Sequence, residues 1–148
     1  MDPGTVGAWG ADWARGLPLI VLTVIFHAYG LGLINKEVVF RSSVKVQPGQ
    51  LPSASIFVIG VTALSATILH ALEGTIWALA YRFLGASPDN KSAMLYSLNA
   101  ITSFGHADIH LAPHWEMMGA LEALNGWILF GLTTAFLFTV VQRAWAHS

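Results

Sequence analysis

The feature that most constrains this chain is a half-polar stretch from Ser87 to Trp115, which lies between two long apolar segments. Its first half has helical spacing, with Ser87 as the expected cap and Pro88 as the expected first helical residue. Its second half contains Gly105 and Pro113, which prevent a long helix. A segment too short to cross a bilayer, yet flanked by segments that do, predicts a re-entrant helix and a returning strand. Such backbone is tolerated at membrane depth only where protein or water surrounds it.

The composition fixes the class of protein. Of 148 residues, 55% are hydrophobic and 10% are charged, which is too apolar for an ordinary soluble domain of this size. The formal net charge of -1 gives no basic excess for binding nucleic acid, and the absence of cysteine excludes disulfides and thiolate metal sites. We therefore expect an all-α integral membrane protein in contact with lipid and without a nucleic-acid partner.

Three apolar segments are long enough to cross a membrane. They cover residues 17–35, about 55–84 and about 116–144. Residues 1–16 are expected to form an external N-terminal segment, either lying on the surface or disordered. Residues 54–148 then contain the second span, the re-entrant stretch and the third span.

The connection at residues 36–53 predicts the orientation. It carries Lys36, Arg41 and Lys45 against a single Glu37, and positive connections stay in the cytoplasm. We expect the chain to lie in the cell membrane, meaning the inner or plasma membrane. With this loop in the cytoplasm, the N-terminus is external and the C-terminus is cytoplasmic. The re-entrant stretch then enters from the external face.

Two histidines and one carboxylate lie inside the first two spans. His27 is expected to be a neutral imidazole bonded to a neighbouring helix, with a ligand or proton-relay role as the alternative. His70 and Glu73 are three residues apart and share a helix face. A carboxylate in a membrane span needs a partner, so this pair is expected to fix packing. Gating or proton sensing is the alternative role.

The third span contains an acid, Glu122, close to several small residues. Glu122 lies towards its start, and the small side chains of Gly119, Ala120, Ala123 and Gly126 permit close helix approach. Gly126 or Gly131 is a candidate hinge. We treat Glu122, Gly126 and Gly131, with His70 and Glu73, as candidate gating or packing residues.

The order of these elements resembles the pore domain of the tetrameric potassium-channel superfamily: outer helix, pore helix, filter and inner helix. The stretch SLNAITSFGHADI, residues 97–109, is similar to the family signature, in which hydroxyl residues precede a T-V-G-Y-G-D filter. The pattern His70-x-x-Glu73-x-x-x-Trp77 and the segment GLTTAFL, residues 131–137, also resemble small bacterial two-helix-pore channels. On this resemblance the filter residues are Thr102, Ser103, Phe104, Gly105, His106, Ala107 and Asp108.

The resemblance implies a homotetramer that conducts cations passively. It implies no enzyme activity, no resident metal and no cofactor beyond a permeant monovalent cation such as potassium. Ala107 stands at the second filter glycine, where a left-handed backbone would cost about 1–2 kcal/mol per subunit. Phe104 and His106 replace the family's valine and tyrosine. We therefore expect a non-standard filter that is potassium-selective or weakly selective.

His106, Asp108 and His110 alternate in the sequence, so they would share one side of an extended strand. A histidine that titrates near pH 6.5 would make the outer mouth sensitive to acid or able to bind a metal. The simpler expectation is that His106 points away from the axis, like the tyrosine it replaces.

Two other hypotheses fit parts of the sequence. A membrane metal- or haem-dependent oxidoreductase would use the H-x-x-x-H spacing of His106 and His110, or His27 and His70 as haem ligands. Against it, the chain lacks adjacent histidine pairs and repeated Glu-x-x-His units. A non-conducting, channel-like subunit with a decayed filter is the third hypothesis.

Overall fold

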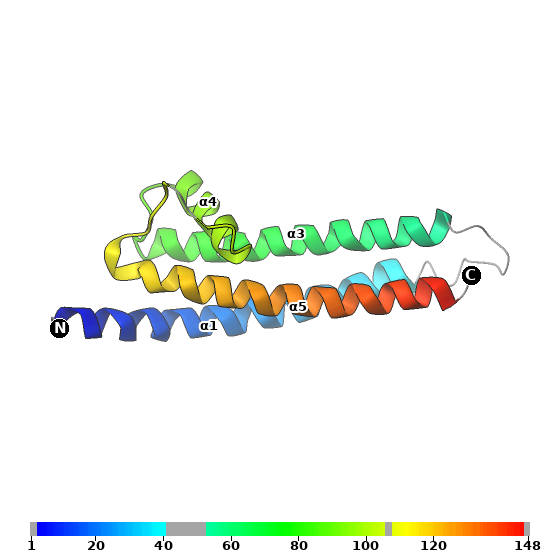
Figure 1. The fold of residues 1–148 in the computed structure, drawn as a ribbon, viewed down its shortest axis with the longest axis horizontal. Helices are drawn as coiled ribbons and strands as arrows, with labels where there is room; N and C mark the ends of the chain where they lie inside the picture. Colours follow the sequence, from blue (N-terminus) through cyan, green and yellow to red (C-terminus); the bar gives the residue numbers. More distant parts are fainter. Residues whose placement is uncertain (1–2, 41–52, 106–107, 147–148) are drawn as a thin grey trace.

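The structure is a computed structural model that describes residues 3–40, 53–105 and 108–146. Its three long helices are α1 (Pro3–Ile34), α3 (Ser53–Phe83) and α5 (Glu116–Ala146), which lie side by side in alternating directions (Figure 1). Each is long and apolar enough to cross a membrane. The prediction of an all-α fold is confirmed for the described residues, and these three helices support the prediction of a multi-pass membrane protein.

The helical part of the first span, with η1 included, is longer at both ends than predicted. It begins at Pro3, inside the expected external segment, and Arg15 near the end of that segment packs against a residue that precedes α5. The guanidinium of Arg15 lies 4.6 Å from the ring centroid of Trp115. After Ile34 the chain continues as the π-helix η1 (Asn35–Phe40), where a loop was expected. The rest of that loop, including Arg41 and Lys45, lies outside the described residues.

Aromatic side chains form the core at one end of the bundle. Trp77 and Tyr81 of α3 are fully buried, and Tyr81 meets Tyr96 edge to face with ring centroids 5.4 Å apart. Met118 and Leu121 of α5 complete this cluster. Edge-to-face pairs contribute about 0.5–1.5 kcal/mol beyond their buried area. This core fixes the short helix α4 (Asn90–Ile101) against α3 and α5.

The predicted cap of α4 is wrong. Asp89, not Ser87, caps the helix, and Pro88 precedes the cap instead of opening the first turn. The Asp89 carboxylate accepts from the backbone N–H of Ser92 at 2.9 Å and from its hydroxyl at 2.7 Å. Ser87 is instead buried. Both residues are good caps by type, and the second contact from Ser92 favours Asp89.

We predict that the first turn of α4 loosens in acid. The hydrogen bonds from Ser92 lower the pKa of the Asp89 carboxyl below its ordinary value of 3.8. The carboxylate therefore stabilises the turn fully above that ordinary value, and this stabilisation is lost as pH falls through the lower folded value. The loosening is measured by hydrogen exchange at the Ser92 amide as a function of pH. Asp89→Asn keeps a capping side chain without a charge and should abolish the acid step; an unchanged step would assign it to another group.

The chain leaves α3 and returns to the same place before entering α5. The backbone N–H of Ala112 donates to the carbonyl of Ala86 at 2.9 Å, which ties the two ends of this excursion together. The 3-10 helix η2 (Pro113–Trp115) then leads into α5. Figure 1 shows α4 and the returning segment beside α3, towards the end of the bundle where α1 begins. Residues 102–105 and 108–112 form turns and irregular backbone, with no strand.

Candidate functional site

The candidate filter residues follow directly after α4. Thr102, Ser103, Phe104 and Gly105 are all exposed in the single chain, and Phe104 is 85% exposed. Gly105 has φ of +91°, in the left-handed region that favours glycine. The structure thus places the first four signature positions together at the carboxyl end of the short helix.

The remaining filter positions are only partly described. Asp108 and His110 are exposed, whereas His106 and Ala107 lie outside the described residues. The alternation of His106, Asp108 and His110 on one side of a strand therefore stays a prediction, as does the effect of Ala107 on the backbone.

The chain leaves α4 through a left-handed residue, Ser103, which has φ of +55°. The N–H of Phe104 donates to the Asn99 carbonyl at 3.0 Å and that of Ser103 to the Ala100 carbonyl at 2.9 Å, a Schellman arrangement. Glycine is the usual residue here, since the left-handed backbone costs other residues about 1–2 kcal/mol. The Ser103 hydroxyl compensates by accepting a 2.9 Å hydrogen bond from the indole N–H of Trp127 in α5.

Glycine in α5 lets α4 approach closely. A Cβ on Gly126 would lie 2.0 Å from the carbonyl oxygen of Ile101, the last residue of α4. A Cβ on Gly119 would lie 2.0 Å from the Tyr96 hydroxyl. Gly126 therefore fixes how near the carboxyl end of α4 comes to α5. Gly131, by contrast, has no described atom within 4 Å of its Cβ position.

Glu122 is fully buried where α3, α4 and α5 meet. Its carboxyl group contacts the Tyr81 hydroxyl of α3 and the Ser97 hydroxyl of α4, each at 2.5 Å. The Ser97 hydroxyl also lies 2.7 Å from the carbonyl of Gly74 in α3. One acid thus joins the short helix to both of its neighbours.

The number of available hydrogens indicates the protonation state of the Glu122 carboxyl. The Ser97 hydroxyl has one hydrogen, so its contacts with Gly74 and Glu122 are both hydrogen bonds only if the Glu122 carboxyl donates one of them. Ser97 then donates to Gly74, and Tyr81 donates to the other oxygen of Glu122. The neutral acid also avoids an unpaired buried charge, which is costly. Glu122 is therefore assigned as a neutral packing residue.

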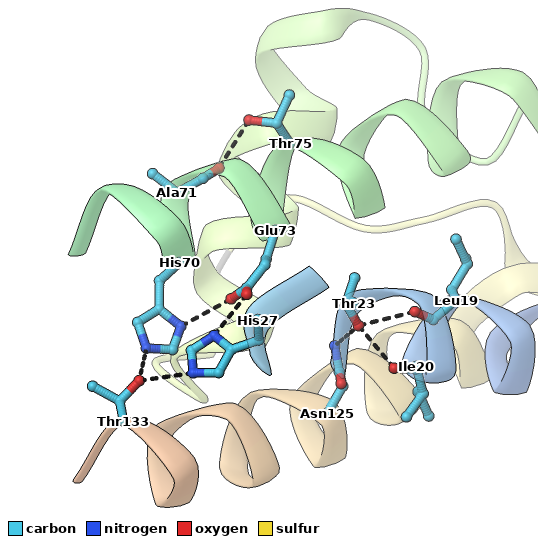
Figure 2. A network of polar contacts seen from close by, with 10 residues as sticks. All are labelled: Leu19, Ile20, Thr23, His27, His70, Ala71, Glu73, Thr75, Asn125 and Thr133. Carbon is cyan, nitrogen blue, oxygen red and sulfur yellow. Dashed lines mark hydrogen bonds and ion pairs between the residues drawn. The ribbon is translucent and has the colours of Figure 1, made fainter. Parts of the chain in front are cut away.

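A second buried polar cluster joins all three spanning helices (Figure 2). The Glu73 carboxylate of α3 contacts two histidines. Its Oε1 lies 2.7 Å from Nδ1 of His27 in α1, and its Oε2 lies 3.2 Å from Nδ1 of His70. The Nε2 atoms of both imidazoles lie 3.0 Å from the hydroxyl oxygen of Thr133 in α5. His27 and Glu73 are fully buried, and the side chain of His70 is 12% exposed. We call this set the His–Glu–His cluster.

Only part of these two clusters could be predicted from the sequence. The i, i+3 spacing of His70 and Glu73 indicated their contact, and His27 bonds a neighbouring helix as expected. Thr133 and Ser97 received no role, although both lie in segments that carry the family resemblance. Nothing in the local pattern distinguishes a hydroxyl that reaches another helix from one that bonds its own backbone.

The candidate residues therefore separate into two places. The filter positions lie at the exposed end of α4, whereas His70, Glu73 and Glu122 lie in the interior of the bundle. Comparison of the chain with models of known protein families, with curated proteins and with solved structures found no match.

Proposed function

We propose that this chain is the pore-forming subunit of a homotetrameric cation channel of the potassium-channel type, potassium-selective or weakly selective. The observation that carries the proposal is the position of the carboxyl end of α4. It contacts Gly126, which lies about 15 Å along α5 from Glu116 at 1.5 Å per residue. That is about half of a hydrocarbon layer roughly 30 Å thick.

At this depth the residues after α4 need polar surroundings. Thr102 and Ser103 are exposed in the single chain; their N–H groups bond carbonyls of α4, but lipid offers no donor to their own backbone carbonyls. Three neighbouring copies and a shared aqueous path would supply those partners. The re-entrant geometry and the filter strand of the resemblance belong to this assembly.

The same position supplies the electrostatics that a cation requires. The carboxyl end of a helix carries a partial negative charge, and Thr102 and Ser103 add hydroxyl oxygens there. Four such ends around an axis would favour a cation in the middle of the membrane. Conduction then needs binding strong enough to admit the ion and weak enough to release it, without covalent chemistry.

The proposed orientation follows from the connection at residues 36–53. Lys36, Arg41 and Lys45 keep it in the cytoplasm, so the carboxyl end of α5 is cytoplasmic as well. The N-terminus and the excursion that contains α4 then lie on the external side of the cell membrane. The filter would face the exterior.

Reconstitution tests the proposal directly. Protein purified in detergent is examined for a tetramer by crosslinking and then placed in a planar bilayer, where reversal potentials are measured in single and mixed salts. We expect a tetramer and a cation-selective current. A monomeric particle, or a tight tetramer that passes no ions under any salt gradient, would refute pore formation.

We further predict that the filter departures weaken potassium selectivity. The double substitution Ala107→Gly with His106→Tyr restores the family residues at those positions, so it should raise the potassium-to-sodium permeability ratio. The ratio is obtained from reversal potentials in mixed salts. A change of ratio, as opposed to a change of amplitude, also assigns the current to this chain. Equal ratios before and after would show that these two positions do not set selectivity.

One observation favours a second function. His27 and His70, the candidate haem ligands of the oxidoreductase hypothesis, lie close together, and Glu73 contacts both. His110 of the H-x-x-x-H pair is exposed, and its partner His106 lies outside the described residues. An absorbing cofactor or tightly bound iron in the purified protein would support this enzyme hypothesis over the channel.

A further inference from the structure

The His–Glu–His cluster has a gap in its hydrogen bonding. Nδ1 of His70 and Oε2 of Glu73 are 3.2 Å apart, yet neither atom has an aligned hydrogen-bond partner among the described residues, and both are buried. The other contacts, from His27 to Glu73 and from both imidazoles to Thr133, are hydrogen bonds. The gap therefore lies at one place in the cluster.

Counting hydrogens identifies what the gap lacks. With both imidazoles neutral, the contacts allow one assignment of hydrogens. His27 donates from Nδ1 to Glu73, and its bare Nε2 accepts from the Thr133 hydroxyl. The Thr133 oxygen then accepts from Nε2–H of His70. This leaves Nδ1 of His70 bare, so two lone pairs face each other across 3.2 Å in a buried site. A positive charge between them would remove that repulsion.

We propose that His27, His70 and Glu73 bind a divalent transition-metal ion with the ligand preference of Zn²⁺. The candidate donor atoms of these three residues all lie within 4.8 Å of one another, so small side-chain movements bring them to bonds of about 2.0–2.2 Å. Two imidazole nitrogens and a carboxylate form a donor set known from zinc sites. Figure 2 shows both rings and the carboxylate directed at one another.

Thr133 is the positioning residue for this site. With the metal on both Nδ1 atoms, each Nε2 carries a hydrogen, and the two lone pairs of the Thr133 oxygen accept both. Metal-bound histidines usually donate their second N–H in this way, which fixes the ring orientation. The metal state thus satisfies the imidazole nitrogens and the carboxylate together. It also binds α1 to α3 through the ion and both to α5 through Thr133.

A metal titration of the metal-stripped full-length protein in detergent tests the inference. Zn²⁺ is titrated calorimetrically, and Co²⁺ is titrated by its visible absorption. We expect one ion per chain, with His27→Gln and Glu73→Gln each weakening binding by more than about 100-fold. Thr133→Val should weaken binding by about 10–100-fold, as loss of such partners does in other sites. Thr133→Ser keeps the hydroxyl and should restore it.

Two control variants separate this site from the surface histidines. The double substitution His110→Gln with His114→Gln removes exposed imidazoles, and Glu122→Gln changes a buried acid of the other cluster. Both should keep full affinity. Binding that disappears in the surface double variant, or wild-type protein that binds neither ion at millimolar concentration, overturns the proposal; in the latter case a proton fills the gap. The experiment measures metal binding alone, so its result tests the metal site independently of ion conduction.

Discussion

Replacing Gly126 with alanine is expected to detach the end of α4 from α5 and to abolish the proposed ion current. The new Cβ would lie 2.0 Å from the Ile101 carbonyl oxygen and 2.8 Å from its carbonyl carbon. These are backbone atoms, so no rotamer change relieves the overlap, and α4 must move. Overpacking of this kind costs about 3 kcal/mol. Thermal unfolding in detergent measures the loss of stability, and bilayer recording measures the loss of current.

Two other glycines of α5 provide matched controls. Gly131→Ala should be neutral or slightly stabilising, since its Cβ position is open and alanine is favoured over glycine in helices by about 0.5–1 kcal/mol. Gly119→Ala should have an intermediate effect, because the nearest atom is the hydroxyl at the end of the Tyr96 side chain. If Gly126→Ala and Gly131→Ala unfold at the same temperature, Gly126 does not determine the packing of α4. A loss of current in Gly131→Ala with unchanged stability would instead favour the hinge role.

The spans could be predicted from the sequence because membrane crossing is a local property of composition. A run of apolar residues as long as the hydrocarbon layer is thick indicates a spanning helix whatever surrounds it. The exact ends of the helices could not be predicted in this way, because composition alone does not determine them. α1 begins at Pro3, and Arg15 in its added first part packs on Trp115, a pair that no local pattern encodes. The cap of α4 depends instead on a local contact, from Ser92 to Asp89 three residues earlier, and residue type alone does not choose between Ser87 and Asp89.

The buried clusters show the same limit more sharply. His70 and Glu73 are close in sequence, so helical spacing predicts their contact. His27 and Thr133 join them from other helices, and spacing says nothing about such pairs. Most hydroxyls of the long helices bond the carbonyl four residues before them: Thr23, Thr62, Ser65, Thr67, Thr75, Thr134 and Thr139. Thr133 and Ser97 differ from these only in what the fold places beside them.

Glu122→Leu is expected to loosen α4, whereas Glu122→Gln is expected to preserve the fold. Leucine leaves the buried Tyr81 hydroxyl with only the Met118 carbonyl, 3.5 Å away and too far for a strong hydrogen bond, and removes the donor to Ser97. A buried unsatisfied hydroxyl costs about 1–3 kcal/mol. Glutamine keeps both contacts, because its carbonyl accepts from Tyr81 and its amide donates to Ser97 as the neutral acid does. Thermal unfolding of the two variants against wild type gives the comparison.

A double variant tests whether the hydrogen bond to Tyr81 accounts for the loss. Tyr81→Phe removes the hydroxyl, and removal of both partners of a buried hydrogen bond is nearly neutral when the shape is kept. Tyr81→Phe with Glu122→Leu should therefore recover most of the stability that Glu122→Leu alone loses. If Glu122→Gln destabilises the protein as much as Glu122→Leu, the acid carries a charge in the folded state. In that case Ser97 donates to Glu122 and the Gly74 carbonyl contact is not a hydrogen bond.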